Sequence, residues 1–194
     1  MVDGSGNIYI AGQTGSDDFL GEANPLTGLS DLFVAKFTPD GTSLLYLKII
    51  AGPDNVAVRD LQVDGAGNAL VTLWTESELF PTHNALWPTP PIAEEMSVLF
   101  KLDSNGAVLY STYLPLDTFG TRHNLAVDAE GHAYVTGSSH VVTASGPIYR
   151  SQMRLLKLSP DGSELLLDRN IGDEAEEKGI AIALDAAGSI YLTG

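Results

Sequence analysis

The sequence predicts an all-β chain made of repeated four-stranded antiparallel sheets, and three observations carry this prediction. The opening phrase VDGSGNIYIAG recurs three times, with the copies beginning at residues 2, 63, 127 and 184. A second phrase, of the type LFVAKFTPDG, lies between successive copies of the first. No window shows the 3.6-residue apolar period of a helix, so a repeat of about sixty residues made of strands is expected.

Each repeat offers four short strands, which we label A to D in chain order. An apolar stretch such as VAVRDLQV, HNLAV or GIAIAL gives strand A, and NIYIAG, NALVTL, HAYVTG and SIYLTG give strand B. In LFVAKF, strand C, the residues alternate, with Leu32, Val34 and Lys36 on one face. SLLYLKII and VLYSTYL give strand D. These runs are rich in β-branched and aromatic residues and end at polar or glycine positions, as strands do.

Tight hairpin turns are expected between strands A and B and between C and D. In the first phrase, an Asp accepts backbone N–H bonds and a Gly three residues later takes positive φ. In the second phrase, a Pro-Asp-Gly or Asn-Gly step closes the hairpin. The predicted structural turn residues are Asp3, Gly6, Asp64, Gly67, Asp128, Gly131, Asp185, Gly188, Gly41, Gly106 and Gly162.

A four-stranded antiparallel repeat of this length is the unit of a β-propeller blade. We expect residues 1–194 to form one propeller segment with repeat units 2–62, 63–126 and 127–183 and a partial unit 184–194. The strand order is B-C-D, two complete A-B-C-D units and A-B, about three and a quarter blades of a partial, open propeller. Open blade faces would favour self-association.

One side of such an array is regular and the other is variable. The A–B and C–D turns are short and alike, whereas the B–C connections, near residues 12–31, 74–97 and 137–153, are long and dissimilar. A ligand is therefore expected at the B–C and D–A loops. The loop residues proposed to face it are Trp74, His83, Trp87, Asp117, Arg122 and His123. For the two tryptophans, the favoured interpretation is that they cap the gap between blades, with stacking on a ligand as the alternative.

Composition excludes several classes of partner. The chain carries 25 acidic and 10 Lys or Arg residues, a net charge of −15, which disfavours nucleic acid and anionic lipid. No apolar run is long enough to span a membrane as a helix, and the start does not resemble a signal peptide. With no cysteine, disulfides and thiolate metal sites are excluded.

No catalytic residue, metal site or cofactor is predicted. Each Asp-x-x-Gly turn offers one carboxylate, and its fifth position is Asn, Asn, His or Ser, unlike a calcium loop. The 4 histidines lack the spacing of a zinc site. No nucleophile elbow and no phosphate-binding glycine motif occur.

The combined phrases resemble the bacterial SBBP repeat, a family named for a seven-bladed β-propeller. The resemblance rests on DLFVAKF-x-PDG, YSTYL at residues 110–114, VDAEGHAYVTG, and LFPT at residues 79–82, and it covers essentially the whole chain. It implies a propeller, usually in large secreted or surface-attached bacterial proteins, and no catalytic motif. Departures from the pattern are LKIIAG in the first unit, Leu73 in place of a glycine, and a third unit without the Phe-Pro element.

The leading functional hypothesis is a non-enzymatic scaffold or interaction module of an extracellular or cell-surface bacterial protein, with a protein or carbohydrate partner. One alternative is part of a carbohydrate-active hydrolase or lyase whose acids come from Asp54, Glu76, Asp117 and Glu174. That enzyme would need two carboxylates roughly 5–10 Å apart in one pocket. Another alternative is a truncated fragment without independent function.

Overall fold

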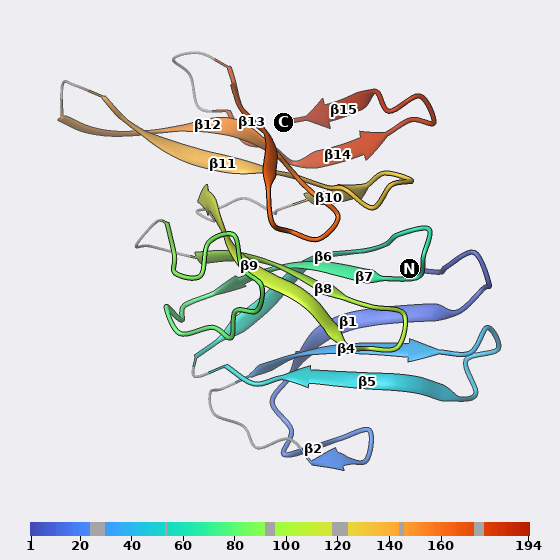
Figure 1. The fold of residues 1–194 in the computed structure, drawn as a ribbon. Coiled ribbons are helices and arrows are strands. Elements are labelled where there is room, and N and C mark those ends of the chain that lie inside the picture. The colour runs from blue at the N-terminus through green and yellow to red at the C-terminus, as the bar shows by residue number, and fades with distance from the viewer. Residues whose placement is uncertain (24–29, 53, 92–95, 118–123, 144–145, 173–176) are drawn as a thin grey trace.

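The computed structural model confirms an all-β chain (Figure 1). It describes residues 1–194 except 24–29, 53, 92–95, 118–123, 144–145 and 173–176. Only strands, bridges and turns occur in the described part, which therefore contains no helix able to cross a membrane. The omitted residues all fall in the expected B–C and D–A connections.

The strands group as the repeats predict. The first sheet has the order β1-β4-β5, from strands β1 (Ile8–Thr14), β4 (Asp31–Phe37) and β5 (Leu44–Ile50). The second sheet contains β6 (Val56–Val63), β7 (Ala69–Thr75), β8 (Met96–Leu102) and β9 (Val108–Asp117). The third contains β10 (Asn124–Val127), β11 (Ala133–Thr143), β12 (Gly146–Leu158) and β13 (Leu165–Ile171). A last hairpin pairs β14 (Ala181–Leu184) with β15 (Ile190–Thr193).

Within the second and third sheets, each strand pairs antiparallel with the next strand in the chain. One residue pair, Asp117 with Ser138, links β9 to β11, so that the second and third sheets connect into one eight-stranded sheet of order β13-β12-β11-β9-β8-β7-β6, with β10 paired to β11. A short hairpin was not predicted from the sequence: β2 (Asp18–Phe19) pairs with β3 (Glu22–Ala23) inside the first B–C connection. Its Phe19 ring packs on Phe33 of β4, with ring centroids 4.5 Å apart.

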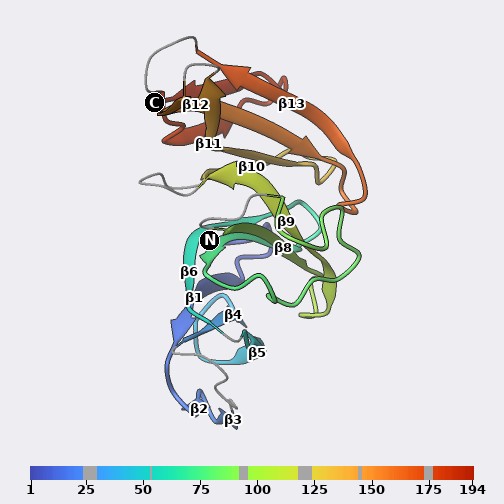
Figure 2. The same ribbon diagram turned by 90° about the vertical axis from the view of Figure 1, so that its left-hand side faces the viewer.

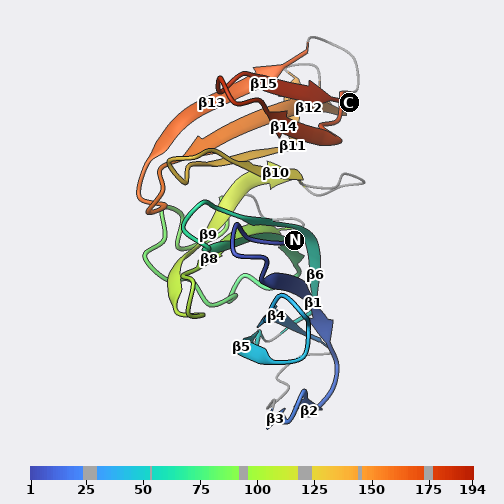
Figure 3. The same cartoon turned by 90° about the vertical axis from the view of Figure 1, so that its right-hand side faces the viewer.

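The sheets lie one upon another, as Figures 2 and 3 show from two opposite sides. Two hydrophobic cores separate them. Val71 of β7 points into the core shared with the first sheet, and its neighbour Leu70 points into the core shared with the third. The second sheet is thus buried on both faces, which explains why NALVTL and SVLFKL show no polar alternation. Each fully buried Leu or Val stabilises the stack by about 1.5–3 kcal/mol.

The two ends of the stack are less covered. Ile10 and Leu45 of the first sheet are 46% and 50% exposed, and Tyr191 of β15 is 59% exposed. In the second sheet, Val71 and Leu70, which correspond to Ile10 and Tyr191, are fully buried because a sheet packs on each side, whereas Leu109, which corresponds to Leu45, is 38% exposed.

Candidate functional site

The four A–B turns share one hydrogen-bond network. At the first, the Asp3 Oδ1 atom accepts from the backbone N–H groups of Ser5 and Asn7, both at 2.9 Å, and Oδ2 accepts from the Asn7 amide. Asp64, Asp128 and Asp185 accept equivalent backbone bonds. The glycines at the fourth position of the turn all have positive φ, at Gly6, Gly67, Gly131 and Gly188. The Asp carboxylate therefore closes the turn itself.

The first junction between sheets uses a lysine of strand C. The Lys36 Nζ atom donates to the carbonyl of Ser104 in the next C–D turn, at 3.1 Å, and lies 3.7 Å from the Asp3 carboxylate. The Tyr9 hydroxyl donates to the carbonyl of Gly67 in the next A–B turn, at 2.9 Å. The side chains of one sheet thus bind the backbone of both turns of the following sheet.

The second junction repeats this contact with one substitution. The Lys101 Nζ atom donates to the carbonyls of Pro160 at 3.0 Å and Gly131 at 3.2 Å, and lies 3.2 Å from the Asp64 carboxylate. Leu70 stands where the first repeat has Tyr9, so the lysine takes over the bond to the A–B turn. Lys101 is 2% exposed, and three acceptors surround its three protons. We call this arrangement the lysine–turn junction.

At the third repeat, only part of this arrangement is present. The Lys157 Nζ atom lies 3.5 Å from the Asp128 carboxylate and 4.8 Å from the centre of the Tyr134 ring. No carbonyl of a following turn bonds Lys157 in the described part of the chain, and its side chain is 24% exposed. The lysine of the third repeat therefore keeps the ion pair within its own sheet and has no described bond to a following turn.

Close contact explains the glycines of the C–D turns. A Cβ atom at Gly106 would lie 2.9 Å from the Tyr46 ring, and one at Gly162 would lie 2.6 Å from the Tyr110 ring. Both glycines also have positive φ. Each tyrosine comes from strand D of the preceding sheet, so a larger side chain at either glycine would push neighbouring sheets apart.

A pocket of about 760 Å³ opens between the second and third sheets, on the side of the A–B and C–D turns. Asp64, Lys101, Glu130 and Asp161 supply its charged lining. Its apolar lining includes Leu86, Leu109, Ala129 and Pro160. The segment Asn84–Leu86, from the long second B–C connection, reaches this side because Asn84 donates its amide to the carbonyl of Leu109 at 3.1 Å.

The carboxylates around the pocket are held in the ionised form. Burial alone would raise the pKa of Asp64, but hydrogen bonds from Asn68 and the contact with Lys101 outweigh it and lower the pKa. Hydrogen bonds from Ser159 and Ser163 lower the pKa of Asp161 to about 2. These two carboxylates are therefore ionised at neutral pH and are not general acids.

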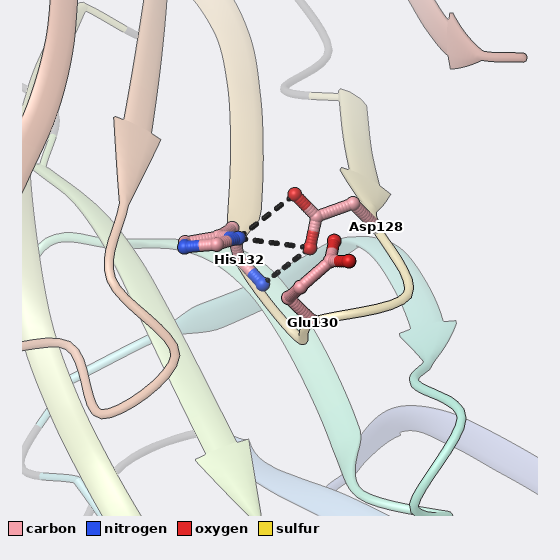
Figure 4. A group of neighbouring side chains, drawn as sticks. All are labelled: Asp128, Glu130 and His132. Atoms are coloured by element: carbon pink, nitrogen blue, oxygen red, sulfur yellow. Dashed lines mark hydrogen bonds and ion pairs between the residues drawn. The ribbon is translucent and has the colours of Figure 1, made fainter. Parts of the chain in front are cut away.

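One group of side chains in the described residues has the spacing of metal ligands: Asp128, Glu130 and His132, whose possible ligand atoms lie within 4.8 Å of one another (Figure 4). The hydrogen bonds of the A–B turn already explain why Asp128 and His132 lie together. The Asp128 carboxylate accepts from the backbone N–H of His132 at 2.9 Å and contacts its Nδ1 atom at 2.8 Å. His132 occupies the position of Asn7 and Asn68 and uses Nδ1 as they use their amide nitrogens.

The loop residues proposed to face a ligand do not gather at one place in the described structure. Trp87 packs against both hydrophobic cores, which is the gap-capping position that the sequence favoured for the tryptophans. His83 is exposed and pairs through its backbone with Ser111, at 3.0 and 2.8 Å, so it lies along the outer edge of β9. Trp74 is half-buried at the end of β7. Arg122, His123 and the Asp117 side chain lie outside the described residues.

The acids proposed for an enzyme are only partly described. Asp54 is exposed, and Glu76 accepts a hydrogen bond from the Asn55 amide at 3.0 Å. Glu174 and the Asp117 side chain fall outside the described part. Neither Asp54 nor Glu76 lines the pocket between the second and third sheets.

Sequence reasoning placed the candidate site on the variable loops and did not single out the pocket on the turn side. The one available signal was a lysine kept at the same strand position, between apolar residues, in three repeats (Lys36, Lys101 and Lys157). A charged residue inside a buried strand needs partners, and here those partners form one wall of the pocket.

No protein-family model matches the chain, and no curated protein matches it either.

Proposed function

We propose that the repeats are blades of a β-propeller of the SBBP type, which act as a non-enzymatic scaffold and interaction module. The observation that carries this proposal is the lysine–turn junction, because a strand-C lysine bonds the following C–D turn both between the first and second sheets and between the second and third. A propeller is built by repeating one such contact around an axis. Four-stranded antiparallel order within the second and third sheets supports the same arrangement.

The chemistry of the pocket favours binding over catalysis. The ammonium group of Lys101 directs its three N–H donors to three neighbours, the carbonyls of Gly131 and Pro160 and the Asp64 carboxylate. Asp64 and Asp161 are ionised by their own turns and therefore lack the raised pKa of a general acid. A groove with fixed charges and apolar walls is suited to hold a partner.

The proposed setting is a secreted or surface-attached bacterial protein. This part rests on the resemblance of DLFVAKF, YSTYL and VDAEGHAYVTG to the SBBP repeat. In that setting, the partner would be a protein or a carbohydrate bound by the loops or by the pocket between blades.

The enzymatic alternative gives a direct test. Purified chain would be incubated with a panel of soluble polysaccharides, and the release of reducing ends would be followed together with binding. We expect no release above the level of an Asp54→Asn, Glu76→Gln double variant. Turnover that this double variant abolishes would overturn the non-enzymatic assignment.

A further inference from the structure

The pocket between the second and third sheets has the form of a binding site for an elongated group. Leu86 and Leu109 come from the second repeat and Pro160 from the third, so the apolar walls belong to two different sheets. Glu130 and Asp161, both from turns of the third repeat, add exposed carboxylates. A ligand that lies against both walls would contact two repeats at once.

The charge of the pocket is negative once its internal bonds are counted. Among the described residues of the lining, Lys101 is the one cation, and its bonds to Asp64 and to two carbonyls already neutralise and occupy it. The described bonds of Asp161 end on Oδ1, from Ser159 and Ser163, which leaves Oδ2 open. Glu130 is exposed. The chain as a whole carries −15, which raises the local concentration of cations.

A second, independent observation points to a missing hydrogen-bond partner. The Tyr110 side chain is fully buried, and its hydroxyl has no partner among the described residues. Tyr110 lies opposite Lys101 in the β8–β9 ladder, so both side chains leave the sheet on the side of the pocket. Its ring lies against Gly162, the residue between Asp161 and Ser163 in the pocket wall, so the hydroxyl lies behind this wall and Tyr110 is not among the described lining residues.

We propose that this pocket binds a primary alkylammonium group, either the side chain of a lysine in a peptide partner or a free polyamine. The aliphatic stem packs between Leu86 and Leu109, and the ammonium group lies at Glu130 and Asp161. Such a group matches the apolar walls and the carboxylates together, because it combines an apolar chain, a positive charge and three N–H donors. The proposal deepens the proposed function, since it names the partner chemistry of an interaction module.

The test uses nuclear magnetic resonance of the ¹⁵N-labelled chain, titrated with N-acetyl-lysine methylamide and, separately, with 1,5-diaminopentane. We expect saturable shifts of the amides of Ala129–Gly131 and Asp161–Ser163. The lysine amide acetylated on its side-chain nitrogen is the neutral control and should not bind. Tighter binding of the lysine amide than of the diamine indicates a peptide partner, and the reverse order indicates a free polyamine.

Glu130→Gln should raise the dissociation constant about threefold or more, the effect of removing one exposed ion pair. Glu76→Gln is the matched control, because it removes the same charge at the far end of β7 and should leave the constant unchanged. An equal effect of both variants would mean diffuse attraction to the net charge and would overturn the proposal. So would binding of the acetylated control, or no saturable shift at all. Failure here leaves the hydrolysis assay unaffected, so the two proposals fail separately.

Discussion

Replacing Lys101 with methionine tests the lysine–turn junction, because methionine keeps the apolar stem and removes the charge. The substitution leaves the buried carbonyl of Gly131 and the part-buried carbonyl of Pro160 without their donor and leaves Asp64 without its cation. Breaking a buried ion pair costs about 3–5 kcal/mol. Asp64 keeps the bonds from Ala66 and Asn68, so we expect the lower end of that range, about 3 kcal/mol.

The assay is urea unfolding of the full chain, followed by fluorescence and circular dichroism. Lys157→Met is the matched control, since Lys157 makes one ion pair at 3.5 Å and is 24% exposed. It should lose no more than about 1 kcal/mol of unfolding free energy. Lys36→Met, with one carbonyl partner, should fall between the two. Equal losses for Lys101→Met and Lys157→Met would refute the reasoning.

Three further predictions concern the turns. Gly162→Ala should cost about 2 kcal/mol or more in unfolding free energy, whereas Gly188→Ala, which has positive φ but open space around it, should cost about 1 kcal/mol. Similar losses in thermal melts would contradict the close contact with Tyr110. Tyr9→Phe should cost about 1 kcal/mol through the lost bond to Gly67, and Tyr191→Phe, which bonds only its own exposed turn, should cost less. In acid, unfolding free energy should fall between about pH 4 and pH 2, as urea titrations at several pH values would show, and a flat profile would count against the turn networks.

The sign of the acid prediction follows from the turn aspartates. Hydrogen bonds from Asn7, Ser5 and Tyr9 outweigh burial and lower the pKa of Asp3 to about 2, and the pKa values of Asp64, Asp128 and Asp161 are also lowered. A carboxylate with a lowered pKa in the folded state stabilises it above the unfolded pKa and loses that effect as the pH falls. Asp60 acts in the opposite direction, since burial raises its pKa, but it is one group against seven aspartates with a lowered pKa, these four and Asp40, Asp168 and Asp185.

Much of the fold could be predicted from local patterns. The recurring phrases gave the strand order, and the Asp and Gly spacing gave the A–B turns, because these depend on contacts within a few residues. The hairpin β2–β3 was missed, since two-residue strands leave no periodic signal and this one is held by packing of Phe19 on Phe33. Propensity does not report such tertiary contacts.

The candidate site was less predictable because it depends on contacts between repeats. The exchange of Tyr9 for Leu70 looks like drift in the sequence, yet in space it accompanies a second bond from Lys101 to the next turn. The Asn84–Leu86 segment belongs to a variable B–C connection, and its return to the turn side rests on backbone pairing with β9 near Ser111. Neither relation follows from spacing along the chain.

The central claim is that each complete sheet is joined to the next by a lysine buried against the turns of its neighbour. The most direct measurement is the hydrogen exchange of the lysine side-chain ammonium groups, followed by nuclear magnetic resonance of ¹⁵N-labelled chain. The account predicts a slowly exchanging Nζ signal for Lys101 with contacts to Gly131 and Pro160, and fast exchange for Lys157. Exchange of Lys101 as fast as that of Lys157 would contradict it.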